Sequence, residues 1–262
     1  MKTMEIKLWD DNIPFYTEGA DTPNYMTYYF APTHHPLPCV VIYPGGGYGE
    51  RADHEGGPIA EFFTSRGIHA AVVEYRTSPN RHPAPLADAQ RAIKLIRQRA
   101  KELCVDPDRI VTLGFSAGGH LAASTITLPP VETDVADDAS KQSCLPNGAV
   151  LCYPVIDVTE KFGHVGSGKN LLGENYESQK EEFSLQHHVN KKTPKVFLWH
   201  TSDDPVVSVK NSLAFGEKLR DFKIPFEMHI FPHGPHGLGL AKSTFDVCKW
   251  ADLAADWIIR NI

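Results

Sequence analysis

The chain has 262 residues, of which 42% are hydrophobic, so it can build a substantial core in one large domain or two small ones. Disordered chains combine low hydrophobicity with high net charge, and this composition therefore argues against disorder. The 26 Lys and Arg residues against 32 Asp and Glu residues give a formal net charge of −6, which argues against a nucleic acid as the main partner because phosphates need a basic surface.

The compartment is predicted from the apolar segments and the cysteines. No apolar run is long enough to span a membrane, and residues 1–5 lead into polar–apolar alternation without the apolar core of a signal peptide. We therefore expect a cytoplasmic protein that does not bind membranes. An odd number of cysteines without a CxxC pair indicates reduced, mostly buried thiols, and these are Cys39, Cys104, Cys144, Cys152 and Cys248.

In chain order, short apolar runs rich in β-branched residues alternate with helical patterns, which is typical of a parallel α/β sheet. We expect strands at residues 5–9, 25–30, 39–43, 69–75, 109–113, 149–153, 196–200 and 226–231, the first two as an antiparallel lead-in. We expect helices near residues 55–65, 86–103, 116–127, 208–222 and 245–259, with Asp106-Pro107 breaking the chain after the second. No linker separates two halves, so we predict one domain over residues 1–262.

One long segment does not fit the alternation. Residues 157–190 are rich in Gly, Lys, Glu and His and have no clean hydrophobic period. We expect them to form a small polar insertion that lies over the strand ends.

Ser116 occupies the centre of Gly114-Phe-Ser-Ala-Gly118, directly after an expected strand and at the start of an expected helix. A sharp strand-to-helix turn lifts a serine hydroxyl above the sheet, and glycines flank it because larger side chains would clash. The helix that follows also directs its positive end toward the serine. Ser116 is therefore the candidate nucleophile, and an ordinary glycine-rich turn is the alternative.

A second glycine-rich segment, residues 44–48, follows the strand expected at 39–43. Consecutive glycines leave backbone N–H groups uncovered, and a tetrahedral oxyanion needs such donors. The candidate donors are the N–H groups of Gly46, Gly47 and Ala117, and Tyr48 is a candidate substrate contact beside them. A flexible turn and a phosphate-binding loop are the alternatives, although the segment lacks the G-K-[ST] ending and the G-x-G-x-x-G spacing.

The nucleophile needs a general base from a loop that follows a later strand. After the last expected strand come His233 and His236, and we favour His236 because a flexible Gly-Leu-Gly segment follows it. Adjacent histidine pairs lack the i, i+4 spacing of a helical metal site, so we interpret them as solvated residues and expect no metal or other cofactor. They are His34, His35, His187 and His188.

The base in turn needs an orienting carboxylate between the serine and the histidine in the chain. Asp203 and Asp204 both follow the strand expected at 196–200. Adjacent side chains point in different directions, so only one of them can face the histidine. From position alone the choice between them stays open, as does a role for both in capping the next helix.

Taken together, these residues resemble the α/β-hydrolase superfamily. The sequences GFSAGGH at 114–120 and PGGGY at 44–48 resemble those of hormone-sensitive-lipase-like carboxylesterases and of the acetyl-xylan-esterase-like branch near them. The resemblance implies an α/β-hydrolase fold with a mostly parallel central sheet of about eight strands and helices on both faces. It implies Ser116 as nucleophile and His236 as base.

The resemblance also implies Asp204 as the acid. In the family loop an Asp is followed, after three residues, by a Pro, and here Ser208 stands at that place. A second departure is Pro44 in place of the usual oxyanion-loop histidine, and the acetyl-xylan-esterase-like branch shares this departure.

The implied activity is hydrolysis of short-chain, acetyl esters of sugars or xylo-oligosaccharides through an acyl-enzyme on Ser116. The polar character of residues 157–190 favours such a substrate over the long acyl chains of lipases. The alternatives are a serine peptidase of the prolyl-oligopeptidase type and a non-catalytic binding protein on the same fold. The expected partner is a small-molecule ester, and a homo-oligomer is compatible with the sequence.

Overall fold

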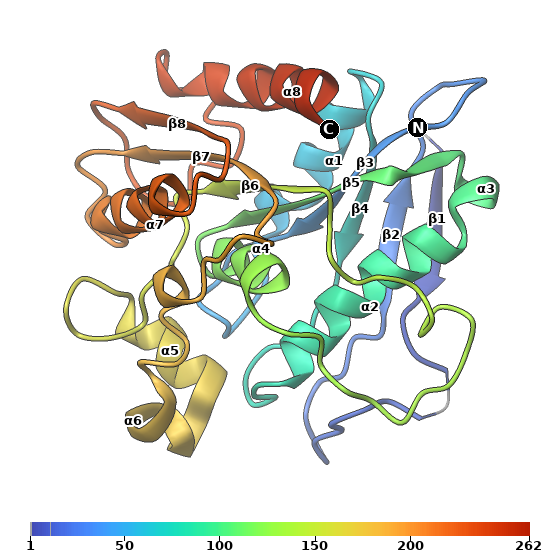
Figure 1. Cartoon of the computed structure of the whole chain (residues 1–262), viewed down its shortest axis with the longest axis horizontal. Coiled ribbons are helices and arrows are strands. Elements are labelled where there is room, and N and C mark those ends of the chain that lie inside the picture. Colours follow the sequence, from blue (N-terminus) through green and yellow to red (C-terminus); the bar gives the residue numbers. More distant parts are fainter. Residues whose placement is uncertain (1, 11) are drawn as a thin grey trace.

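The computed structural model describes residues 2–10 and 12–262, and in these residues eight strands form one sheet with the order β1-β2-β4-β3-β5-β6-β7-β8 (Figure 1). The strands are β1 (Thr3–Lys7), β2 (Tyr25–Tyr29), β3 (Leu37–Tyr43), β4 (His69–Val73), β5 (Val105–Phe115), β6 (Gly148–Cys152), β7 (Lys195–Thr201) and β8 (Phe226–Phe231). The helices are α1 (Gly57–Thr64), α2 (Ala84–Gln98), α3 (Ala100–Leu103), α4 (Ala117–Thr127), α5 (Val165–Leu172), α6 (Tyr176–Gln179), α7 (Lys210–Asp221) and α8 (Trp250–Asn261).

The sheet is mostly parallel. β1 and β2 pair antiparallel, as does β2 with β4, whereas the strands from β4 to β8 in the sheet order pair in parallel. The central strands β4 and β6 are buried along their whole length, since helices cover both sides of the sheet. The predicted fold class and the antiparallel lead-in are confirmed.

The helices form two layers (Figure 1). On one face, Ile93 of α2, Leu121 of α4 and Phe215 of α7 belong to one apolar cluster. On the other face, Phe63 of α1 and Trp250 of α8 belong to a second cluster. Parallel strands thus end together at one edge, between the two helix layers.

Three differences between the predicted elements and the structure go beyond a few residues at an end or change how an element is divided. Asp106 and Pro107 do not break the chain but lie within β5, where the register with β3 shifts. An irregular stretch of strand accommodates extra residues and a proline that lacks an N–H group. The helix expected at 86–103 is divided into α2 and α3, and the last helix begins at Trp250 after a short 3-10 turn at Val247–Lys249.

The polar segment 157–190 contains the short helices α5 and α6 (Figure 1). Asn170 of α5 donates a hydrogen bond from Nδ2 to the backbone oxygen of Gly47, at 3.0 Å, in the loop that follows β3. The segment therefore lies over the carboxyl edge of the sheet, as expected. All five cysteines are free thiols, and three of them are buried. Within the described residues, no helix is both long and apolar enough to cross a membrane.

Candidate active site

Ser116 lies in a tight turn between β5 and α4. Its backbone has φ 53° and ψ −118°, and its N–H group donates to the oxygen of Cys152 at 3.0 Å. A Cβ atom on Gly118 would collide with the backbone oxygens of Tyr43 and Pro44, so this position requires glycine. The turn thus holds the serine at the carboxyl edge of the sheet. The residue is 8% exposed.

His236, from the loop after β8, lies between Ser116 and Asp204. Its Nε2 atom is 2.8 Å from Ser116 Oγ, and its Nδ1 atom is 2.7 Å from Asp204 Oδ2. A carboxylate only accepts hydrogen bonds, so Nδ1 carries the imidazole proton and donates a hydrogen bond to Asp204. Nε2 is then free to accept the hydroxyl proton of Ser116. This is the protonation state that a general base requires.

Asp204 is held in place by several donors. Its Oδ1 atom accepts the N–H groups of Val206 at 2.8 Å and Val207 at 3.0 Å, and its Oδ2 atom also lies 3.4 Å from His200 Nε2. Burial by itself would raise the pKa of Asp204, but the contacts with His200, His236 and the two N–H groups outweigh it and hold the pKa below its usual range. The carboxyl group therefore stays ionised beside His236.

Asp203 points away from this arrangement. Its Oδ2 atom is 2.9 Å from His233 Nδ1, and its Oδ1 atom accepts the N–H group of Gly234 at 2.9 Å. This pair is exposed, with side-chain exposures of 51% for Asp203 and 85% for His233. The two aspartates thus face two different histidines, and only Asp204 contacts the one that reaches Ser116.

The glycine-rich loop after β3 folds beside the serine. Gly46 and Gly47 have φ angles of 128° and 63°, and a Cβ atom on Gly46 would collide with the backbone oxygen of Glu50. Among the residues that the structure describes, no acceptor pairs with the N–H group of Gly46 or Gly47. The N–H group of Ala117 belongs to the first turn of α4, where helices lack intrahelical acceptors.

The side chain of Tyr48 does not line the site as we expected. Tyr48 is 1% exposed, and its hydroxyl lies 2.9 Å from His120 Nδ1 inside the fold. His120 in turn contacts the oxygen of Phe183 through Nε2, at 2.9 Å. The phenol ring is buried and packs edge-on against Tyr75, so it is unavailable to a substrate.

The polar insertion contributes His164 near the site. Burial lowers the pKa of His164, and the nearby imidazole of His236 lowers it further. Its Nδ1 atom accepts the N–H group of Ser167 at the start of α5, at 3.2 Å. No sequence motif marks His164, which is one histidine among 13. No local pattern marks His200 or the buried Glu55 either, because their positions depend on contacts between distant segments.

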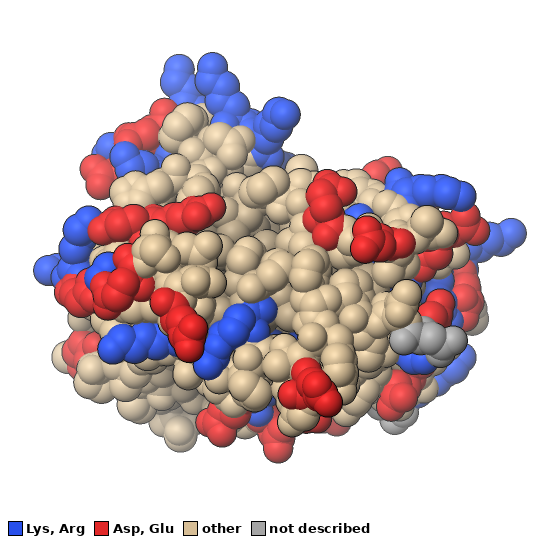
Figure 2. Space-filling model, turned by 90° about the horizontal axis from the view of Figure 1, so that it is seen from below, with Lys and Arg blue, Asp and Glu red and all other residues tan. Residues whose placement is uncertain are grey.

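The charged residues are unevenly distributed on the face that Figure 2 shows, seen from below the view of Figure 1. Acidic and basic side chains gather toward both sides of this face and are sparser over its middle. The picture shows both signs of charge interspersed, which fits the absence of a basic motif from the sequence.

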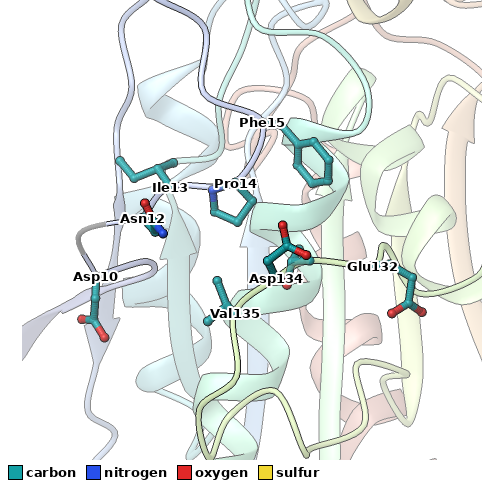
Figure 3. A pocket seen from close by; sticks show the side chains of 9 residues that line it. Asp10, Asn12, Ile13, Pro14, Phe15, Glu132, Asp134 and Val135 are labelled. Carbon is teal, nitrogen blue, oxygen red and sulfur yellow. The ribbon is translucent and has the colours of Figure 1, made fainter.

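A separate cavity of about 520 Å³ lies between residues 10 and 12–15 on one side and residues 132–135 on the other (Figure 3). Ile13, Pro14, Phe15 and Val135 line it with apolar side chains, and the acidic residues Asp10, Glu132 and Asp134 line it as well. None of its lining residues belongs to the Ser116, His236 and Asp204 arrangement. In the described part of the chain, no group of three or more His, Cys, Asp or Glu residues has the arrangement of a metal site.

Several known proteins are similar to this chain. The sequence pattern of the BD-FAE family matches residues 27–219. Endo-1,4-beta-xylanase B of Butyrivibrio fibrisolvens is 39% identical over 212 residues, which are 79% of this chain and 33% of that protein. Acetylxylan esterase of Xylanibacter ruminicola is 31% identical over 207 residues, 77% of this chain and 41% of that protein. This chain thus spans about a third and about two fifths of the length of these relatives.

A crystal structure of an acetyl ester-xyloside bifunctional hydrolase from Caldicellulosiruptor lactoaceticus is similar over nearly its whole length. It is 45% identical, has a TM-score of 0.92, and the match covers 98% of this chain and 95% of that one. An α/β hydrolase from a deep-sea metagenome library is 29% identical with a TM-score of 0.73, over 98% of this chain and 96% of that one. The resemblance to acetyl-xylan-esterase-like carboxylesterases is confirmed. The chain belongs to the BD-FAE family of α/β hydrolases.

Proposed function

We propose that this protein is a serine carboxylesterase that hydrolyses short-chain esters, above all acetyl esters of sugars or xylo-oligosaccharides. The observation that carries the proposal is the hydrogen-bonded chain from Ser116 Oγ through His236 to Asp204, with distances of 2.8 Å and 2.7 Å. The proposal includes residues 1–262 acting as one catalytic domain, since all eight strands belong to one sheet in the described residues.

The first half of the cycle forms an acyl-enzyme. Ser116 Oγ attacks the ester carbonyl carbon while Nε2 of His236 takes the hydroxyl proton. The resulting tetrahedral intermediate collapses, and the C–O bond to the alcohol breaks as His236 donates that proton to the leaving oxygen. The imidazolium that forms between these steps is stabilised by Asp204, which the neighbouring donors keep ionised.

The second half releases the acid. A water molecule loses a proton to His236 and attacks the acyl carbon, and collapse of the second tetrahedral intermediate returns the proton to Ser116 Oγ. In both halves the negative oxygen is assigned to the N–H groups of Gly46, Gly47 and Ala117. Removing one such donor typically costs about 3–4 kcal/mol of transition-state stabilisation.

The substrate class is proposed from the relatives and from the insertion. One relative is named an acetylxylan esterase, and a solved relative is described as an acetyl ester-xyloside bifunctional hydrolase. Segment 157–190, which lies over the carboxyl edge, places His164 near His236 and Asn170 against the glycine-rich loop. Polar groups that converge beside a reactive serine suit the hydroxyl groups of a sugar better than a long acyl chain.

The experiment measures turnover of aryl acetate, butyrate and octanoate by the purified protein, together with acetate release from acetylated xylo-oligosaccharides. We expect the acetyl ester to be hydrolysed fastest and acetate to be released from the oligosaccharides. Fastest hydrolysis of the octanoyl ester would contradict the short-chain assignment. Labelling by an organophosphonate separates a serine hydrolase from a non-catalytic binding protein, and turnover of prolyl peptides in place of esters would favour the peptidase.

A further inference from the structure

Glu55 is a buried carboxylate next to the candidate site that the cycle above does not use. It ends a short 3-10 turn, Asp53–Glu55, and is 1% exposed. Each of its carboxylate oxygens is hydrogen-bonded. Oε2 accepts the N–H group of Gly45 at 2.7 Å, and Oε1 accepts the hydroxyl proton of Tyr153 at 2.5 Å. A buried carboxylate needs such partners to compensate the loss of water, and Gly45 and Tyr153 supply them here.

The Gly45 contact leads to the oxyanion side of the site. Gly45 directly precedes Gly46 and Gly47, and it packs against the turn that carries the nucleophile. A Cβ atom on Gly45 would lie 3.1 Å from the Cβ atom of Ser116 and 2.6 Å from Oε2 of Glu55. Glu55 therefore fixes the glycine-rich loop at the point where this loop touches the serine.

The Tyr153 contact leads to the base. The hydroxyl oxygen of Tyr153 accepts the N–H group of Gly239 at 3.0 Å, three residues after His236. The ring of Tyr153 also packs against the His236 ring, with centroids 5.0 Å apart and an interplanar angle of 67°. His54, the neighbour of Glu55, lies 2.9 Å through Nε2 from the oxygen of Gly237 in the same loop. The 3-10 turn thus holds the loop of His236 through His54 directly and through Glu55 by way of Tyr153.

The surroundings of Glu55 raise its pKa overall. Burial raises the pKa of Glu55, while the contacts with Tyr153, Gly45, His54 and His236 oppose this rise. The attraction to His236 places the carboxyl group within electrostatic reach of the base.

We propose that Glu55 is a positioning residue whose carboxylate joins the loop of the oxyanion donors to the loop of the base, so that both keep one geometry relative to Ser116. This inference rests on the proposed function. Glu55 accepts both hydrogen bonds, from the N–H group of Gly45 and from the hydroxyl group of Tyr153, and a carboxylate can accept both at once. An amide at this position satisfies one partner and presents N–H groups to the other.

The first test is Glu55→Gln, which keeps the shape of the side chain. We expect kcat for an aryl acetate to fall by at least about tenfold, because small displacements of reacting groups cost about this much or more. KM should stay within about twofold, since Glu55 does not touch the substrate. The matched control is Glu74→Gln, which should keep wild-type kcat. The carboxylate of Glu74 accepts a hydrogen bond from Arg51 Nε at 2.6 Å and shares no hydrogen bond with Glu55, Gly45 or Tyr153.

A second variant, Tyr153→Phe, removes only the hydroxyl group between Glu55 and Gly239. If Glu55 and Tyr153 act in one network, kcat of the double variant Glu55→Gln/Tyr153→Phe should fall by clearly less than the product of the two single fold decreases. Multiplying losses would overturn the inference, as would a Glu55→Gln variant that keeps wild-type kcat and only unfolds at a lower temperature.

Rates of labelling by a fluorophosphonate separate this inference from the proposed function, because Ser116 attacks phosphorus and expels fluoride without any ester substrate. Wild-type protein that fails to hydrolyse esters overturns the proposed function. In that case tenfold slower labelling of Glu55→Gln still supports the positioning role, and equal labelling refutes it.

Discussion

Replacing Asp204 with Asn tests the candidate site most sharply, because the structure shows which atoms the amide would face. Oδ1 of Asp204 accepts two backbone N–H groups, so the amide oxygen of Asn would take that place. The NH₂ group would then face Nδ1 of His236, which is 2.7 Å away. To accept a hydrogen bond from this NH₂ group, the imidazole must carry its proton on Nε2 instead of Nδ1. That tautomer cannot take the proton of Ser116.

A histidine held in the wrong tautomer lowers kcat by about 10⁴-fold, which corresponds to about 5.5 kcal/mol of transition-state free energy. The assay compares kcat/KM of the wild type and of Asp204→Asn for an aryl acetate, with thermal unfolding measured to verify that the variant is folded. The matched control is Asp203→Asn. We expect its rate within about threefold of the wild type, because exposed pairs such as Asp203 and His233 contribute at most about 1 kcal/mol.

The ranking of the two variants decides the matter. A folded Asp204→Asn variant with more than about a tenth of the wild-type rate would refute the tautomer argument. A larger loss in Asp203→Asn than in Asp204→Asn would assign the acid to the other residue.

Three further outcomes are expected. Ser116→Ala should abolish ester hydrolysis and phosphonate labelling while the unfolding temperature stays within a few degrees; retained turnover would exclude this serine as nucleophile. Gly118→Ala should destabilise the fold by about 1–3 kcal/mol and reduce activity, since its Cβ would meet the backbone oxygen of Tyr43, and denaturant unfolding measures this. The hydrogen bonds from Arg91 lower the pKa of Asp137 from 3.8 to about 2. A carboxyl group with a depressed folded-state pKa stabilises the fold above its unfolded pKa, so this stabilisation should be lost as the pH falls from about 4 to 2, and Asp137→Asn should flatten that part of the stability profile.

Much of the fold follows from local patterns. Apolar β-branched runs are typical of strands in a sheet that is covered on both faces, and this made the strands predictable. The strand at 226–231 has the predicted boundaries, and the remaining strands differ by a few residues at their ends. β5 was predicted too short, since its first residues include Asp106 and Pro107, which disfavour a strand locally. Pairing with β3 overrides that preference across a register shift.

The sequence by itself determined the strand–turn–helix around Ser116, the glycine-rich loop and the short list of histidines and aspartates, because each depends on neighbours in the chain. Position in the chain left Asp203 and Asp204 open and the family resemblance implied Asp204, while the tertiary structure shows that Asp204 rather than Asp203 faces His236. It also turned Tyr48 inward. These outcomes depend on the direction of single side chains and on contacts between segments more than 30 residues apart, such as His236 with Asp204 and Tyr48 with His120, and no local pattern encodes such distances.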